Sequence, residues 1–277
     1  MAVESHAFVD QGVNANVTYV QGNAVYAALA SKDVDLIEIS PDPIINADIN
    51  SNSDMVYLAS FSSQATWSLY VDKSIQSAAD LKGKKLAAYL PGDPSDFGMR
   101  AALKLLGLQA SDVSMVSLGT TEARSAALYN GQVSGALMSP PETFRAASQG
   151  FHDLQDTYSV PHEGVGLVML RSRMAEFANV MPRVVVAFRN GMQWFNTHPT
   201  EAKAVLKKYT KESDDTIIQK TYDFFINQTP FKLDMQPSIP AIQAEMDYLG
   251  DTVTPAAKNH KPEEFIDTRF LSALAKN

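Results

Sequence analysis

The segment AVYAALASKDVDLIEISP, residues 24–41, aligns without gaps with ARSAALYNGQVSGALMSP, residues 123–140, at an offset of 99 residues. Seven of the 18 aligned positions are identical. In each copy an alanine-rich helix runs into a polar turn and then into a short apolar strand that ends in Ser-Pro. Because the same helix-turn-strand unit occurs twice, we expect two related α/β halves.

The segments on either side extend the repeat. A short β-prone segment precedes each helix, at residues 17–20 and at residues 113–116, and each of these follows a helix that stops at Gly12 or Gly107. In the second half, a strand at residues 85–89 leads into that helix. An equivalent strand of the first half would precede the first residue, so we expect the first half to lack its first strand and part of its first helix.

Strands that alternate with helices predict an α/β fold of two doubly wound lobes. Two β-rich stretches, residues 55–70 and residues 163–170, are long enough to carry the chain between the lobes as hinge crossings. The remainder of the chain is helical in pattern and, having no second copy to pair with, is expected to pack on the incomplete first lobe. We therefore expect lobe 1 to comprise residues 1–68 plus 166–277, and lobe 2 residues 69–165.

Composition excludes several classes of protein. The 277 residues are 45% hydrophobic, which suffices for a sizeable core, and no run approaches the roughly 20 apolar residues that a membrane-spanning helix needs. A formal charge of −8 argues against nucleic acid as a partner. The absence of cysteine excludes thiol nucleophiles, disulfides and thiolate metal sites, and five scattered histidines indicate neither a metal nor a cofactor. The first residues form no signal peptide, which either never existed or has been removed.

Four segments together resemble a known family, the solute-binding proteins of ABC importers for nitrate, sulfonates, taurine and pyrimidine precursors of thiamine. They are SAADLKGKKL at residues 77–86, the loop and helix at 91–108, the segment 131–151 with its Ser-Pro-Pro, and KPEEFIDTRF at 261–270. The resemblance implies a type II periplasmic-binding-protein-like fold whose two lobes close on a small molecule and deliver it to an ABC permease. It also implies a periplasmic or extracytoplasmic location, possible lipid anchoring, and no enzymatic activity. Members of this family begin with an export signal and a first strand, and this chain has neither.

Ligands of open α/β sheets bind beyond the carboxyl ends of strands and against helix N-termini. In the first half and at the two crossings, the polar or aromatic residues expected there are Asn23, Ser40, Ser62, Ser63, Trp67, His162 and Glu163. Each has a structural alternative. Asn23 would equally serve as a helix N-cap, Ser40 as the end of a strand, and Trp67 as core, which for a tryptophan beside a strand is the more common role.

The second half offers Asp93, Ser95, Asp96, Ser139 and Glu142. Asp96 or Ser95 is expected to cap the following helix whatever else these residues do. The Ser-Pro of both copies fits either a shared structural turn or two opposed lips of a cleft, and both interpretations stay open.

The charges predict the class of ligand. Five acidic residues are expected near the ligand and no Lys or Arg among them: Asp42, Asp93, Asp96, Glu142 and Glu163. A neutral, heteroaromatic or cationic ligand is therefore favoured over a strongly anionic one.

Three other functions compete with solute capture. An enzyme on the same fold is the first, but the related desulfinase uses a cysteine nucleophile and the related pyrimidine synthase carries a cysteine-bearing motif, and this chain has no cysteine. A sensory module with the same binding lobes is the second. The third is a chain that binds nothing, or that dimerises to cover the sheet edge left by its missing strand; a monomer is otherwise expected.

Overall fold

The computed structural model describes residues 1–20 and 24–276 of the chain. The chain forms two compact units. Unit 1 contains residues Met1–Ser63, His162–Lys211 and Pro230–Asn277, and unit 2 contains residues Gln64–Pro161 and Glu212–Thr229. The chain passes between the units four times: after Ser63, after Pro161, and at both ends of residues Glu212–Thr229.

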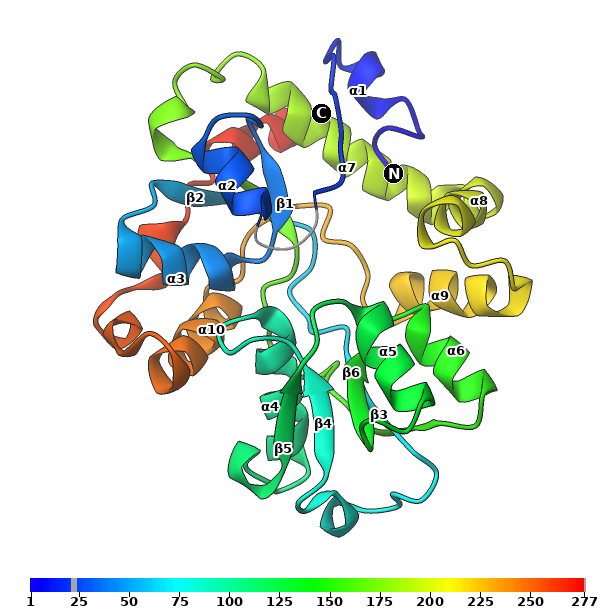
Figure 1. Ribbon diagram of the computed structural model, residues 1–277. Coiled ribbons are helices and arrows are strands. Elements are labelled where there is room, and N and C mark those ends of the chain that lie inside the picture. The colour runs from blue at the N-terminus through cyan, green and yellow to red at the C-terminus, as the bar shows by residue number, and fades with distance from the viewer. Residues whose placement is uncertain (21–23, 277) are drawn as a thin grey trace. The chain divides into compact units, whose positions relative to one another are not determined.

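Unit 2 is a five-stranded sheet covered by helices on both faces (Figure 1). Its strands are β3 (Ser68–Val71), β4 (Lys85–Ala88), β5 (Ser114–Ser117), β6 (Gly135–Met138) and β7 (His152–Asp156), in the order β5-β4-β6-β3-β7. Strand β4 pairs in parallel with β5 and β6, whereas β3 pairs antiparallel with β6 and β7. Because β5 and β6 lie on opposite sides of β4, this part of the sheet is doubly wound.

The helices of unit 2 divide between the two faces of its sheet. They are α4 (Pro94–Leu105), α5 (Thr121–Tyr129), α6 (Glu142–Ser148) and α9 (Asp215–Asn227). Leu86 and Ala88 of β4 pack toward α4, in a cluster with Met99 and Leu103. Ala87 packs on the other face, toward α5 and α6. This alternation is the period-two pattern of a strand buried on both faces.

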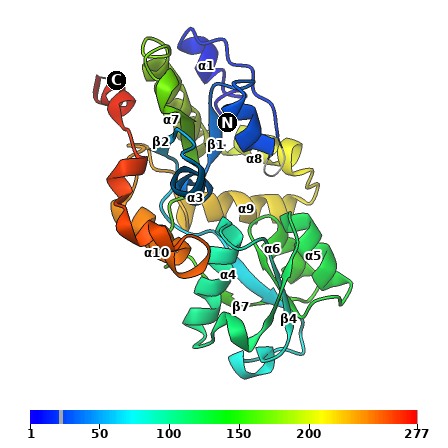
Figure 2. The ribbon, with the colours of Figure 1, turned by 60° about the vertical axis from the view of Figure 1, so that its left-hand side comes forward.

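Unit 1 holds a three-stranded sheet in the order β1-β8-β2, and Figure 2 shows its helices from a second direction. The strands are β1 (Ile37–Ile39), β2 (Met55–Ser60) and β8 (Gly166–Leu170). The helices are α1 (Ala7–Asp10), α2 (Ala24–Ala30), α3 (Pro41–Ser51), α7 (Met181–Thr197), α8 (Pro199–Thr210) and α10 (Ile239–Thr252). Strand β8 is antiparallel to both of its neighbours, and its side chains alternate between a core on α7 and a core on α2 and α3.

The internal repeat is confirmed at the level of single hydrogen bonds. After α2 the backbone N–H of Lys32 donates to the carbonyl of Leu29 at 3.1 Å, and 99 residues later Gly131 donates to Leu128 at 3.0 Å. Lys32 and Gly131 both have a φ of 67°. Glycine adopts this left-handed conformation without cost, whereas lysine adopts it here because the turn requires it. The two-lobed α/β fold expected from the sequence is therefore present.

One predicted strand does not form. Residues 17–20 are expected to be the counterpart of β5, but they form no strand, and Tyr19 is 87% exposed. In unit 2, β5 exists because it pairs with β4 along its whole length. The described part of unit 1 contains no counterpart of β4, so the N–H and C=O groups of residues 17–20 have no strand to pair with.

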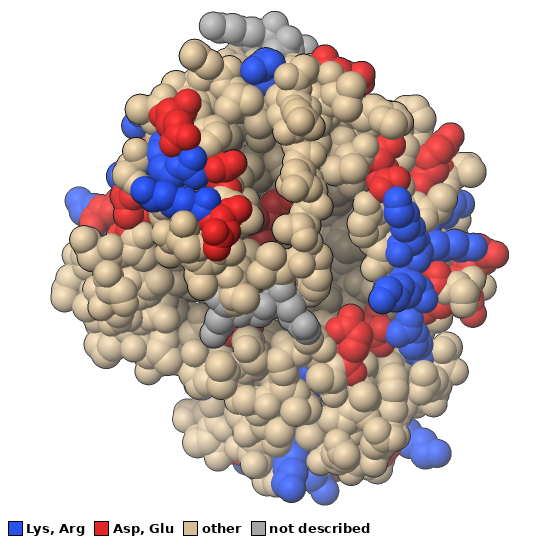
Figure 3. Space-filling model, turned by 45° about the horizontal axis from the view of Figure 1, so that its top comes forward, with Lys and Arg blue, Asp and Glu red and all other residues tan. Residues whose placement is uncertain are grey.

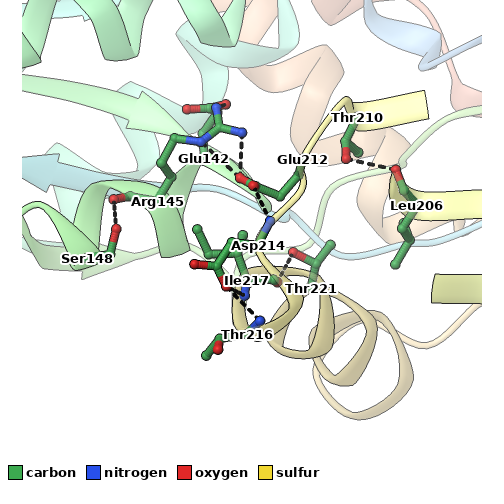
Figure 4. Close-up of polar contacts among 10 residues, drawn as sticks. All are labelled: Glu142, Arg145, Ser148, Leu206, Thr210, Glu212, Asp214, Thr216, Ile217 and Thr221. Atoms are coloured by element: carbon green, nitrogen blue, oxygen red, sulfur yellow. Dashed lines mark hydrogen bonds and ion pairs between the residues drawn. The ribbon is translucent and has the colours of Figure 1, made fainter. Parts of the chain in front are cut away.

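Helix α9 belongs to unit 2, whereas the helices before and after it in the tail belong to unit 1. Its Phe224 ring contacts Tyr158 at 5.1 Å and Phe144 at 6.4 Å, both in unit 2. Figure 4 shows the polar attachment, in which Arg145 of α6 lies between Glu142 and Glu212. The Arg145 Nη2 to Glu212 Oε2 distance is 2.6 Å. Aromatic packing and a buried ion pair thus join α9 to unit 2, although the sequence-based division assigned residues 166–277 to lobe 1.

Charged side chains of opposite sign lie beside one another on the face shown in Figure 3. Ion pairs between exposed or half-buried side chains of unit 1 include Lys208–Glu4, Arg173–Asp35 and Arg269–Asp267. Among the described residues, none of the helices combines the length and the hydropathy that crossing a membrane requires.

Candidate functional site

Unit 1 gathers three buried titratable side chains from distant parts of the chain, namely Asp42, His162 and Glu245. Asp42 is the second residue of α3. Ser40 ends the β1 segment in an extended conformation and Pro41 begins the helix, because its fixed φ suits the first helical position and its missing N–H is not needed there. The turn therefore buries the Asp42 carboxylate in the first turn of the helix, where the helix dipole favours a negative charge.

His162 and Glu245 come from two other elements of unit 1. His162 stands where the chain re-enters unit 1, four residues before β8. Glu245 lies on the buried face of α10, between Ile242 and Met246, and α10 packs against α3. This packing brings an acidic residue of one helix opposite the N-terminus of another.

The three side chains are close enough to act on one ligand atom. The His162 Nε2 atom lies 3.5 Å from Asp42 Oδ2 and 3.4 Å from Glu245 Oε1. Exposed fractions are 0% for Asp42, 3% for His162 and 0% for Glu245. The Glu245 Oε1 atom also accepts the backbone N–H of Glu163 at 2.5 Å.

The neighbouring Glu163 is buried as well, but its carboxylate has several hydrogen-bond donors. Its Oε2 atom accepts from Ser63 Oγ at 3.0 Å and from the backbone N–H of Ser238 at 2.9 Å, and Tyr57 Oη lies 3.4 Å from its Oε1. Lys232 Nζ donates to Ser63 Oγ at 2.9 Å, which places a positive charge close by. Glu163 is thus a structurally satisfied buried acid.

Glu245 and Asp42 have far fewer partners. Both carboxylate oxygens of Asp42, and Oε2 of Glu245, are buried without a hydrogen-bond donor among the described residues. Burial raises the pKa of Glu245 well above its usual value, and the carboxylates of Asp42 and Glu163 raise it further. Burial also raises the pKa of Glu163, although the donors named above oppose that effect. The contrast marks the Asp42 and Glu245 pair as a place where a positive charge is missing.

The other candidates of this half have mainly structural contacts. Ser62 accepts the N–H of Gly164 on its carbonyl at 2.8 Å, and Ser40 Oγ is buried without a partner among the residues described. Trp67 packs in unit 2 over Gly98, where an added Cβ would lie 2.6 Å from its ring. That contact is the core role expected as the alternative to stacking on a ligand. Asn23 lies outside the described residues.

In unit 2 most candidate residues are engaged with their own helix. Asp93 caps α4 by accepting the N–H of Ser95 at 2.9 Å, and the Ser95 hydroxyl donates to the same oxygen at 3.0 Å. Asp96 forms an ion pair of 2.6 Å with Arg100. The cap therefore belongs to Asp93, two residues before Ser95 and three before Asp96, the caps that the sequence predicts, because Pro94 occupies the first helical position.

Ser139 and Glu142 lie on either side of Pro140 and Pro141 in unit 2. Ser139 is half-buried and is followed by a cis peptide bond between Pro140 and Pro141. Glu142 is buried and forms an ion pair with Arg145, so its charge is compensated within unit 2.

Sequence analysis missed two residues. Glu245 lacks a local motif, and only the burial of an acidic residue on an apolar helix face marks it. Arg124 is 4% exposed in α5, and its guanidinium donates to the carbonyls of Leu137 at 2.9 Å and Leu118 at 3.3 Å, just where β6 and β5 end. A buried cation therefore lies at the carboxyl edge of the unit 2 sheet, where every charged residue that the sequence predicts is acidic.

The chain is similar in sequence to one protein family and in fold to several solved structures. A family model described as NMT1/THI5 like matches residues 1–202. The periplasmic aliphatic sulphonate-binding protein SsuA of Escherichia coli is 20% identical, with a TM-score of 0.74 over 97% of this chain and 86% of that one. The alkanesulfonate-binding protein SsuA of Xanthomonas axonopodis pv. citri, bound to MOPS, is 18% identical, with a TM-score of 0.74 over 93% of this chain and 88% of that one.

A third similar structure is a DszB variant in complex with biphenyl-2-sulfinic acid. It is 14% identical, with a TM-score of 0.74 over 100% of this chain and 95% of that one. No curated protein matches the sequence. At these identities the structural likeness establishes the fold.

Proposed function

Because the chain belongs to the NMT1/THI5-like family, we propose that it is an extracytoplasmic solute-binding protein that captures a small organic molecule for delivery to an ABC permease. The observation that carries the proposal is the family match together with a two-unit fold shared with a periplasmic binding protein. The periplasmic location of the similar SsuA protein supports the same compartment for this chain.

We also propose that the protein is not an enzyme. The two SsuA structures are of binding proteins, whereas DszB shows that this fold also supports an enzyme. The chain has no cysteine to act as a covalent nucleophile. In unit 2, Asp93 is held in a helix cap and Asp96 in an ion pair with Arg100, so neither carboxylate is free to act as a general base.

The proposed ligand is neutral, heteroaromatic or cationic. Asp42 supports this class, because no Lys or Arg among the described residues forms an ion pair with its buried carboxylate. Arg124 is the group that would favour an anion instead, since it is a buried cation at the carboxyl edge of a sheet. A ligand that contacts Asp42 is thus expected to be neutral or cationic, and a ligand that contacts Arg124 is expected to be anionic.

A thermal-shift panel on the purified chain tests both parts of the proposal. The panel contains an aminopyrimidine alcohol, a quaternary amine, nitrate, taurine and MOPS, each at millimolar concentration. A ligand present at 100 times its dissociation constant stabilises the folded state by about 2.7 kcal/mol, which is readily measured as a rise in melting temperature. Stabilisation by the pyrimidine or the amine supports the proposed ligand class.

The matched variants are Asp42→Asn and Arg124→Gln. If taurine or MOPS stabilises the wild type and Arg124→Gln abolishes the effect, the ligand class is wrong although solute capture stands. Turnover of any stabilising compound into a product, followed by mass spectrometry, would contradict the assignment as a binding protein. Size-exclusion chromatography tests the accompanying expectation that the chain is a monomer.

A further inference from the structure

We propose that Asp42, His162 and Glu245 bind a divalent transition-metal ion inside unit 1. The three residues offer one imidazole nitrogen and two carboxylate groups, and their ligand atoms all lie within 4.8 Å of one another. The inference uses the same Asp42 carboxylate as the proposed ligand class, but it does not rest on solute capture, because it concerns three side chains of one unit and requires no solute.

The distances fit a coordination sphere better than a hydrogen-bond network. Zinc ligands lie about 2.0–2.2 Å from the ion, so two ligands of a tetrahedral site are about 3.4 Å apart. The His162 Nε2 atom lies 3.4 Å from Glu245 Oε1 and 3.5 Å from Asp42 Oδ2. A charge-assisted hydrogen bond would draw these atoms to about 2.8 Å.

The charges point to a dication. Asp42 and Glu245 are fully buried, and no Lys or Arg forms an ion pair with either one in the described part of the chain. Lys232 is occupied by Ser63 Oγ at 2.9 Å and by the carbonyl of Gln236 at 2.5 Å. Two buried carboxylates without a Lys or Arg partner are costly, and one bound dication would neutralise both.

Three buried carboxylate oxygens have lone pairs available to the ion. Asp42 Oδ1 and Oδ2 and Glu245 Oε2 are buried without donors among the residues described. The other Glu245 oxygen accepts the N–H of Glu163 at 2.5 Å, and Glu163 is itself fixed by Ser63 and Ser238. Such an outer hydrogen bond orients a ligating carboxylate, as it does in established metal sites.

The imidazole decides the kind of metal. Oxygen-only sites suit Mg²⁺ and Ca²⁺, whereas a mixed imidazole and carboxylate site suits Zn²⁺, Mn²⁺, Fe²⁺ or Co²⁺. The ligands also lie on structured elements, since α3 and α10 pack together and His162 is four residues from β8. A site on rigid elements needs little reorganisation to bind the ion.

The test uses the full chain, stripped with a chelator and dialysed. Co²⁺ is added first, and its visible absorption reports inner-sphere coordination in a low-symmetry or tetrahedral site. ZnCl₂ is then titrated to displace Co²⁺, with isothermal titration calorimetry giving stoichiometry. We expect one ion per chain, loss of the Co²⁺ bands on adding Zn²⁺, and no competition from equimolar Mg²⁺.

Two variants locate the site and one serves as a control. His162→Gln and Glu245→Gln should each weaken Zn²⁺ binding by at least about 100-fold, because each removes a ligand. The control is His260→Gln, which removes the exposed imidazole that lies 2.8 Å from Glu264 and could bind zinc at the surface. It should leave binding unchanged.

Several results would overturn the proposal. They are the absence of Co²⁺ bands in the wild type, retention of binding in both ligand variants, or its loss in His260→Gln. The wild-type Co²⁺ spectrum decides without any substitution, so a variant that fails to fold by circular dichroism does not remove the test. A pair of acids that merely shares a proton would give no Co²⁺ bands.

Discussion

Strands β1 and β6 are counterparts in the internal repeat, yet their surroundings differ. Strand β6 lies between β4 and β3 and has a paired edge on each side. Strand β1 pairs with β8 on one side, and no other strand in the described ranges, 1–20 and 24–276, pairs with it. The same helix-turn-strand segment is therefore a central element in unit 2 and an edge element in unit 1.

The Ser-Pro turns after these strands differ in a second way. In unit 2 the acid that follows, Glu142, forms an ion pair with Arg145 of the same helix. In unit 1 the acid that follows, Asp42, meets His162 and Glu245 instead of an arginine or lysine. The acid of unit 2 is thus paired with a cation three residues away in the same helix. The acid of unit 1 meets side chains from distant segments of the chain. The same local turn therefore precedes an acid with an ion-pair partner in unit 2 and, among the described residues, an acid without hydrogen-bond donors in unit 1.

The largest effect is expected from alanine at the glycine that begins each central strand. A Cβ at Gly166 of β8 would lie 1.9 Å from the backbone carbonyl oxygen of Ala59, which cannot move without breaking the sheet. We expect Gly166→Ala to cost more than about 4 kcal/mol of unfolding free energy. Gly135→Ala in β6 meets side chains, with Leu86 Cδ2 at 2.9 Å, and should cost about 1–3 kcal/mol.

Urea denaturation of both variants, followed by circular dichroism, measures the difference. Equal losses of unfolding free energy in the two variants would contradict the prediction. They would show that a clash with a backbone oxygen at Gly166 costs no more than a clash with side chains at Gly135.

The paired leucines Leu29 and Leu128 give the next largest effect. They occupy the same position of the repeat and are both buried, Leu29 among the β1 and β8 residues and Leu128 among those of β4 and β6. Replacement by alanine should cost about 2–5 kcal/mol in each case. We expect Leu29→Ala to fall at the lower end, because a core beside an edge strand can collapse into the cavity more easily.

Thermal and urea unfolding of the two leucine variants provides the measurement. A larger loss for Leu29→Ala would mean that β1 is held as firmly as β6 by groups other than strand partners.

The Glu212 attachment of α9 predicts that the stability of the protein depends on pH. Burial raises the pKa of Glu212, but the N–H of Asp214 and the guanidinium of Arg145 lower it more, so the net pKa lies below its ordinary value of 4.5. A group with a lowered pKa in the folded state contributes stability above its unfolded pKa and loses it as the pH falls through the folded pKa. The wild type should therefore lose stability below about pH 4.5.

Glu212→Gln should remove this part of the acid dependence and cost about 1–3 kcal/mol at pH 7, because it breaks a charge-assisted hydrogen bond. Urea midpoints between pH 3.5 and pH 7 test it, with Glu176→Gln on the exposed Arg173 pair of unit 1 as the control. Parallel curves for wild type and Glu212→Gln would contradict the assignment.

The smallest effect is expected at the turn that both copies share. Lys32 and Gly131 both have a φ of 67°. Lys32→Gly should stabilise the protein by up to about 1 kcal/mol, and Gly131→Ala should destabilise it by about 1 kcal/mol, because a side chain is strained in this conformation. Melting temperatures of the two single variants check the opposite signs, and shifts of the same sign would show that the two turns are not equivalent.

Much of the fold could be predicted because its signals are local. Gly12 and Gly107 end their helices as expected, with the following residue donating back to Phe8 and to Leu103 at 2.8 Å in each case. The apolar residues Val184, Met192 and Phe195 recur at helical spacing in α7 and are buried. Capping, periodicity and glycine conformation depend on a few neighbouring residues, so a pattern in the sequence suffices to predict them.

The candidate site could be predicted only in part. His162 and Glu163 were selected for their place at a crossing, and Ser95 and Asp96 for their place before a helix. Nothing near Glu245 or Arg124 in the sequence marks them, since their importance comes from which distant residues they meet. The ligand-binding role of the sequence-derived residues stays a prediction.

The sequence by itself determined the repeat, the α/β class and the helix ends, because those follow from periodicity, turn residues and identical spacing in the two copies. Tertiary structure alone decided that residues 17–20 form no strand, that α9 joins unit 2, and that Asp42, His162 and Glu245 share one buried place. Each of these depends on partners that are far away in the sequence. A strand needs a neighbour for its backbone, and a buried charge needs a counter-charge, and neither requirement is visible in the local pattern.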